Sequence, residues 1–123
     1  MKLLNNQLDK SSLANFGQEA CRLFMARDFR GLADTFGYAF AGNWDVAAAI
    51  EADFDRCLSG RSCQDARVES VTVKYCQPND PALVAVVECV VAVGQEGRLL
   101  IELIVANNGD DTNLYLEDVN AVA

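Results

Sequence analysis

The spacing of hydrophobic residues changes near the middle of this 123-residue chain. As far as about Leu58, apolar side chains recur every three or four residues, as in amphipathic helices. From about Val68 onward they form long runs rich in valine and isoleucine, which is typical of strands. Helices followed by antiparallel strands predict a single α+β domain, with helices at about 11–60 and a sheet at about 66–122.

Three helices are predicted in the first half. The first begins at Ser11 or Ser12, because a serine hydroxyl can accept a hydrogen bond from a first-turn amide, and it runs to about Ala26. The second follows Asp28 as its N-cap and keeps the helical spacing as far as Phe40, and Gly37 and Gly42 weaken and end it.

The third helix begins after Asn43 or Asp45 and runs to about Leu58. Gly60 follows where a residue with left-handed backbone often ends a helix. After Gly60 the helical spacing stops, so we expect the remaining chain to form strands and turns.

The clearest part of the sheet is the hairpin formed by Ala82–Val93 and Arg98–Val105. We expect a three-residue loop at 95–97, with Gly97 in the left-handed conformation, which places even-numbered positions of both strands on one face. The odd-numbered face has no polar residue, so we expect the helices to pack against it. A first strand is predicted at Val68–Cys76, before a turn at 77–81, and a last strand at Leu114–Val122, after a polar turn at 107–113.

From Val84 to Ala92 and from Leu100 to Ile104, the even-numbered positions of the hairpin are apolar except for Glu88 and Glu102. A sheet face exposed to water normally carries more polar residues, and a large apolar patch usually marks an interface. We therefore expect a homodimer through this face, with the two glutamates near its margin or paired. The expected interface residues are Val84, Val86, Val90, Leu100 and Ile104.

The charge of the chain is strongly negative, with a net charge of −8 and a pI of about 4.3. Binding to nucleic acid or to an anionic membrane needs a basic surface, so both are disfavoured. No basic side chain follows Arg98. The acidic residues of this last stretch could attract a basic protein partner, and those that we expect to do so are Asp110, Asp111, Glu117 and Asp118.

The chain contains no histidine and five cysteines. Without histidine, and without a C-x-x-C pair, a zinc site is not indicated, and we expect no metal and no cofactor. The odd number of cysteines and the polar N-terminal residues, which do not resemble a signal peptide, favour reduced thiols in a soluble, cytoplasmic protein. A pairing of Cys57 with Cys63 stays open.

The stretch 21–40, and within it the segment 28–36 (DFRGLADTF), resembles the N-terminal helix pair of the nuclear-transport-factor-2-like superfamily, whose fold is also described as a cystatin-like or polyketide-cyclase-like cone. The resemblance implies a strongly curved antiparallel sheet around the helices, which can leave an apolar pocket for a small ligand. It also implies that an enzyme of this fold would use a carboxylate base with a tyrosine or a second acid in the cone.

Two functions are compatible with these observations. The first is a non-catalytic binding protein, in its most specific form an acidic inhibitor or bacterial immunity protein for a basic partner. The alternative is a small-molecule isomerase or cyclase, for which Tyr38 with Asp45 or Asp118 is the candidate catalytic set; Glu88, Glu102 and Tyr115 are further acid–base candidates. The absence of any recognisable catalytic constellation favours the binding protein.

Overall fold

The computed structural model describes residues 1–39, 45–76 and 82–122. After a short strand β1 (Lys2–Leu3) and one 3-10 turn (Asn5–Gln7), the chain forms three helices and then the long strands of the sheet. The helices are α1 (Lys10–Met25), α2 (Phe29–Phe36) and α3 (Val46–Leu58). The strands that follow are β2 (Arg67–Tyr75), β3 (Leu83–Val93), β4 (Gly97–Asn108) and β5 (Asp111–Val122).

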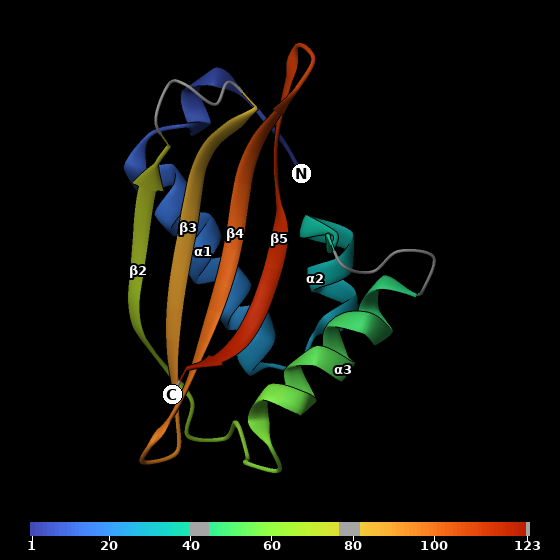
Figure 1. Ribbon diagram of the computed structural model, residues 1–123, viewed down its shortest axis with the longest axis vertical. Helices are drawn as coiled ribbons and strands as arrows, with labels where there is room; N and C mark the ends of the chain where they lie inside the picture. Colours follow the sequence, from blue (N-terminus) through green and yellow to red (C-terminus); the bar gives the residue numbers. More distant parts are fainter. Residues whose placement is uncertain (40–44, 77–81, 123) are drawn as a thin grey trace.

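The five strands form one antiparallel sheet in the order β1-β5-β4-β3-β2. The long strands curve together around the helices, and α1 passes behind β3 and β4 in the view of Figure 1. The predicted α+β class, with three helices before a curved antiparallel sheet, is therefore confirmed.

Aspartates cap all three helices. Asp28 and Asp45 were predicted for α2 and α3, and each accepts a hydrogen bond from a backbone amide of the first turn; the alternative cap Asn43 lies outside the described residues. The predicted serine cap of α1 is wrong. Asp9 takes that place because its carboxylate accepts from both the amide and the hydroxyl of Ser12, at 3.1 and 2.6 Å.

The hairpin keeps the predicted faces, since even-numbered residues of β3 pair with even-numbered residues of β4, but its loop is residues 94–96 and not the predicted 95–97. The glycine assignment in its loop is wrong, however: Gly94 has the positive φ of 65°, and Gly97 instead pairs with Val93 at the start of β4. Val84 is also an exception, because a β-bulge beside it lets its side chain pack against the buried cluster.

The polar segment at 107–113 is mostly strand, contrary to the prediction of a long turn. β4 continues to Asn108 and β5 begins at Asp111, so Gly109, with a φ of 67°, and Asp110 alone form the turn. Strand β1 was not predicted, because two residues are too short to show a period. The predicted turn at 77–81 lies outside the described residues.

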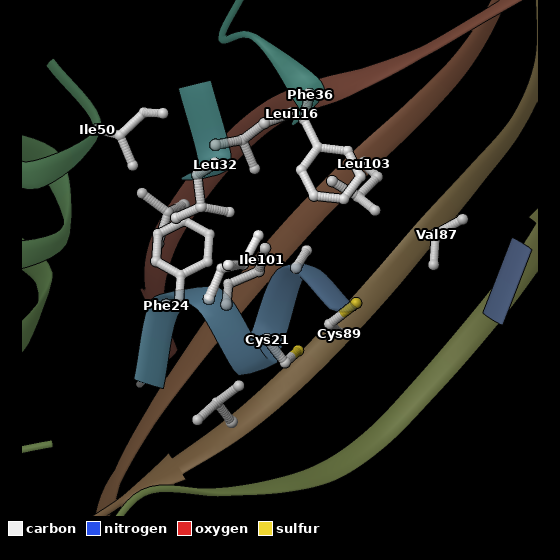
Figure 2. Packing of buried hydrophobic residues seen from close by; sticks show 14 of the residues in the cluster. Cys21, Phe24, Leu32, Phe36, Ile50, Val87, Cys89, Ile101, Leu103 and Leu116 are labelled. Atoms are coloured by element: carbon white, nitrogen blue, oxygen red, sulfur yellow. The ribbon is translucent and has the colours of Figure 1, made fainter. Parts of the chain in front are cut away.

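The space between the helices and the sheet is filled with hydrophobic side chains. Figure 2 shows Phe24 of α1, Leu32 of α2 and Ile50 of α3 beside side chains of the sheet, among them Ile101 and Leu103. All five are nearly or fully buried. The odd-numbered face of the hairpin is thus the core face, as predicted.

Candidate functional site

The face of the sheet opposite the helices, which we call the outer face, consists of rows of side chains that run across the strands. Its middle row consists of Thr72 on β2, Glu88 on β3, Glu102 on β4 and Asp118 on β5, each paired with the next. Three carboxylates therefore stand side by side on adjacent strands. We call Glu88, Glu102 and Asp118 the acidic row.

The acidic row carries an unfavourable concentration of negative charge. The pKa of Glu102 is raised by partial burial and, in decreasing order, by the charges of Glu88, Asp118 and Glu117. Glu117 lies at the irregularity in the pairing of β4 with β5, which brings it next to the row. Lys74 lies 3.0 Å from Glu88 and partly offsets the charge. Like charges directly opposite one another destabilise a sheet. A cation bound beside the acidic row would offset this repulsion.

Apolar rows flank the acidic row on both sides. Val90 pairs with Leu100 on one side, and Val86 pairs with Ile104 on the other. All four side chains are half-buried by their neighbours and lie outside the buried cluster. The structure thus places four of the five residues predicted for a dimer interface together on the outer face; Val84 is the exception described above.

The four residues predicted to bind a basic partner lie in two separate places along β5. Asp110 and Asp111 are at the β4–β5 turn, where Asp111 lies 3.1 Å from the ammonium of Lys2. Glu117 and Asp118 lie about 20 Å farther along the strand, by the rise of about 3.3 Å per residue. The acidic row adds Glu88 and Glu102 to the second group. The sequence placed Glu88 and Glu102 on one face of the hairpin, whereas the adjacency of Asp118 to Glu102 follows from the pairing of β5 with β4.

The residues proposed for an enzyme do not form one free catalytic group. Asp45 accepts a hydrogen bond of 3.0 Å from the amide of Ala48 and so caps α3. The hydroxyl of Tyr38 donates to Asp53 at 2.5 Å, and Arg56 binds the other oxygen of Asp53 at 2.7 Å.

The pKa of Tyr38 is raised chiefly by burial and then by its hydrogen bond to Asp53, with a smaller effect from the charge of Asp118. Asp118 itself accepts from Asn120 at 2.5 Å and from the amide of Val119. Asp53 was missed because its helical position indicates an exposed residue, whereas its contact with Tyr38 depends on how the chain before α3 packs.

Two of the hollows that described residues line lie at the ends of the sheet. One of about 500 Å³ is lined by Ala106, Tyr115 and three asparagines of the β4–β5 hairpin. The other, of about 330 Å³, lies beside the β3–β4 turn and includes Arg67 and Arg98. The side chains that line these hollows come from the sheet and its turns, whereas the buried cluster in Figure 2 fills the space beneath the helices.

The five cysteines are free thiols. Cys57 and Cys63, whose pairing was left open, each donate to a different backbone carbonyl, that of Val119 and that of Met25. Within residues 1–39, 45–76 and 82–122, no three histidine, cysteine, aspartate or glutamate side chains converge on a common point. None of the helices in that part of the chain is both long and apolar enough to cross a membrane.

Comparison of the chain with protein-family models, with curated proteins and with solved structures finds no match. The functional argument therefore depends on the chemistry of the outer face.

Proposed function

We propose that the protein is a non-catalytic binding protein that holds a basic protein partner on the outer face of its sheet. The observation that supports this most strongly is the acidic row, in which Glu88, Glu102 and Asp118 are paired on three adjacent strands. The apolar rows on either side can bury hydrophobic surface of the partner, while the carboxylates bind its lysine or arginine side chains.

The energetics favour a cationic partner over a neutral one. Glu102 already bears the cost of partial burial and of repulsion from its neighbours, which raises its pKa. A guanidinium or ammonium group placed against the row removes that repulsion and forms charge-assisted hydrogen bonds, each worth about 1.5–3 kcal/mol. The net charge of −8 adds long-range attraction, which chiefly increases the association rate.

The most specific form of this proposal is an acidic inhibitor, such as an immunity protein that neutralises a basic toxin. Asp110 and Asp111, at the β4–β5 turn, extend the negative surface toward one end of the sheet. An inhibitor of this kind works by covering a basic active surface, so it needs no catalytic group of its own. The hydrophobic cluster beneath the helices and the charged outer face are compatible with that task.

We do not propose the isomerase or cyclase alternative, because no observation favours it. Such an enzyme needs a carboxylate that is free to take a proton inside an apolar pocket. Asp45 is engaged with the N-terminus of α3, and Asp53 with Tyr38 and Arg56. For the fold, we infer membership of the nuclear-transport-factor-2-like superfamily, supported by the order of three helices and a curved sheet and by α2 at the segment that carries the resemblance.

The experiment is affinity capture from the native host with two matched triple variants. The test variant, Glu102→Gln/Glu117→Gln/Asp118→Asn, removes three charges from the outer face. The control, Glu19→Gln/Asp34→Asn/Glu51→Gln, removes three charges from the helices. We expect a basic protein to be captured by the native chain and by the control, and to bind the test variant at least tenfold more weakly in calorimetry.

The binding should also weaken as salt is added, because exposed charges are screened over about 8–10 Å at physiological ionic strength. A partner that binds the test variant as tightly as the native chain would refute the proposed site. Loss of binding in a further variant, Asp110→Asn/Asp111→Asn, with no loss in the triple variant, would place the site at the β4–β5 turn instead.

A further inference from the structure

The hollow of about 500 Å³ near the β4–β5 turn is built around a small residue. Ala106 on β4 pairs with Asn113 on β5. The longer side chains of Ile104 and Asn108 lie two residues to either side of Ala106, and therefore on the same face of the strand. The methyl group of Ala106 is thus recessed between them and forms the floor. The residues that line the hollow are Ala106, Asn107, Asn108, Asn113 and Tyr115.

The walls of this hollow are held in place by contacts on both sides. Beside the short β4–β5 turn, the hydroxyl of Thr112 donates a hydrogen bond of 2.8 Å to Oδ1 of Asn107. On the other edge of β5, strand β1 pairs with Asn113, and Lys2 forms an ion pair of 3.1 Å with Asp111. Groups that are fixed before a ligand binds lose less conformational entropy when it arrives.

The side chains around the floor are neutral hydrogen-bonding groups. Asn108 and Asn113 each carry an amide that can both donate and accept, and Tyr115 carries a hydroxyl. Within the part of the chain that the structure describes, none of these three side chains has a hydrogen-bond partner. The pKa of Tyr115 is raised by partial burial and by the charge of Glu117, so its hydroxyl keeps its proton at neutral pH. All three groups are therefore available to a ligand.

These groups disfavour charged and wholly apolar ligands. Among the described lining residues there is no basic side chain, and the net charge of −8 repels phosphates and other anions. The same residues include no carboxylate, so a cation has no counter-ion in the hollow. A wholly apolar ligand would cover the amides and leave them without partners, which is unfavourable. A neutral ligand with several hydroxyl groups and an apolar face fits best.

We propose that this hollow binds a neutral saccharide of at least two linked rings. The C–H face of one ring packs on the half-buried ring of Tyr115, and hydroxyl groups of the sugar form hydrogen bonds with the amides of Asn113 and Asn108. From the Tyr115 row to the Asn108 row the strands rise about 13 Å, at about 3.3 Å per residue. A chain of sugar rings carries hydroxyl groups along such a length, whereas a single flat base would stack on Tyr115 and leave the asparagines unpaired.

The site is independent of the proposed function, because it shares no residue with the acidic row. It also lies on an open sheet surface, which covers only one side of a ligand. Little of the sugar is then removed from water, and few hydrogen bonds offset the loss of its translational freedom. We therefore expect weak binding, with a dissociation constant in the millimolar range.

The test is a titration of isotope-labelled protein with maltose, cellobiose, lactose and N,N′-diacetylchitobiose, followed by nitrogen–proton NMR spectra. These neutral disaccharides include both anomeric linkages, a galactose ring and an N-acetylated sugar. We expect at least one of them to shift the side-chain amide signals of Asn108 and Asn113. Backbone signals near Ala106 should shift with them, and those of Glu88 and Glu102 should not.

Three variants test the assignment. Asn113→Ala removes one amide and should weaken binding roughly two- to tenfold, the range expected for one neutral hydrogen bond. Asn15→Ala makes the same change at an exposed position of α1 and should bind like the native chain. Ala106→Leu fills the floor without removing a polar group and should abolish the shifts; it also provides the test if Asn113→Ala does not fold.

Spectra that do not change with any of the disaccharides at millimolar concentration would overturn the inference. So would native affinity in an Ala106→Leu variant that keeps the native circular dichroism spectrum. Shifts of the same signals with adenosine, and none with the saccharides, would assign the hollow to a nucleoside and also overturn it. No protein partner is present in these measurements, so their outcome is separate from that of the proposed function.

Discussion

Replacing Gly17 with alanine should destabilise the protein, although alanine is the better helix former. Gly17 lies on the face of α1 that crosses the sheet, where it is buried. A Cβ atom there would lie 2.9 Å from Cγ1 of Val71, 3.0 Å from Cγ1 of Val87 and 3.0 Å from Sγ of Cys89. The glycine therefore permits a close approach of α1 to β2 and β3.

Two opposing effects determine how Gly17→Ala changes the free energy of unfolding. In an unconstrained helix, glycine to alanine would raise the free energy of unfolding by about 0.8–1 kcal/mol. Optimal contacts between carbon atoms are about 3.5–4.0 Å, so each of the new contacts is short by roughly 0.5–1 Å. Val71 and Val87 are β-branched and have restricted χ1 rotamers, and Val87 and Cys89 are fully buried, so these neighbours cannot turn aside.

The helix must then shift away from the sheet. Overpacking of this kind costs about 1–3 kcal/mol, which exceeds the gain in helix propensity. We expect a net loss of about 1 kcal/mol for Gly17→Ala and a larger loss for Gly17→Leu. A loss of 1 kcal/mol corresponds to a fall of about 4 °C in Tm for a domain of this size.

The measurement is urea unfolding followed by circular dichroism, with two further variants. Asn15→Ala changes an exposed position of the same helix, so it should raise stability through propensity alone. The double variant Gly17→Ala/Val71→Ala removes one of the short contacts. Its loss should be smaller than the sum of the two single losses by more than about 0.5 kcal/mol, the size expected for residues in contact.

A Gly17→Ala variant that is more stable than the native chain by the full propensity gain would refute this reasoning. It would mean that α1 does not approach the sheet as closely as the structure shows. Strict additivity in the double variant would argue against the contact with Val71 in particular.

Three further substitutions test other contacts in the same urea assay. Tyr38→Phe removes the hydroxyl that donates to Asp53 and should lower the free energy of unfolding by about 1 kcal/mol; unchanged stability would contradict the hydrogen bond. Asp45→Ala removes the N-cap of α3 and should cost about 1 kcal/mol, whereas Asp45→Asn should cost less. The pKa of Glu102 is raised above its ordinary value of 4.5 by burial and by neighbouring carboxylates, so the native state loses stability as pH rises through the range just above that value. Glu102→Gln should therefore raise stability at pH 7 by about 0.2–1 kcal/mol, with the two proteins converging near pH 4, and a difference that persists there would contradict the assignment.

Much of the fold could be predicted from local patterns. The three-four spacing of apolar residues indicated the three helices, and the run from Leu83 to Val105 indicated the central hairpin and its core face. These features depend on the spacing of apolar residues a few positions apart, which can be seen in the sequence itself. The errors are local as well: Asp9 rather than a serine caps α1, and Gly94 rather than Gly97 has the left-handed backbone. In both cases more than one nearby residue suited the position, and the local pattern did not distinguish between them.

The candidate site depended on the tertiary structure. Glu88, Glu102 and Asp118 form one row only because β4 pairs with both neighbours in a particular alignment. The irregularity beside Glu102 changes that alignment on the β5 side, and a shift of one residue would have turned Asp118 to the other face. Tyr38 and Asp53 likewise meet through the packing of separate segments.

The sequence thus determined which residues form helices and strands and which face of the hairpin is buried, because the burial of apolar side chains repeats along the chain with the period of each element. Which charged residues lie together is set by strand pairing and by the approach of helices to the sheet. Arg67 and Arg98 are separated by 31 positions in sequence, yet both flank Ala92. Charged side chains on an exposed face add little to folding, so the pairing of Asp118 with Glu102, which completes the acidic row, is visible only in the three-dimensional structure.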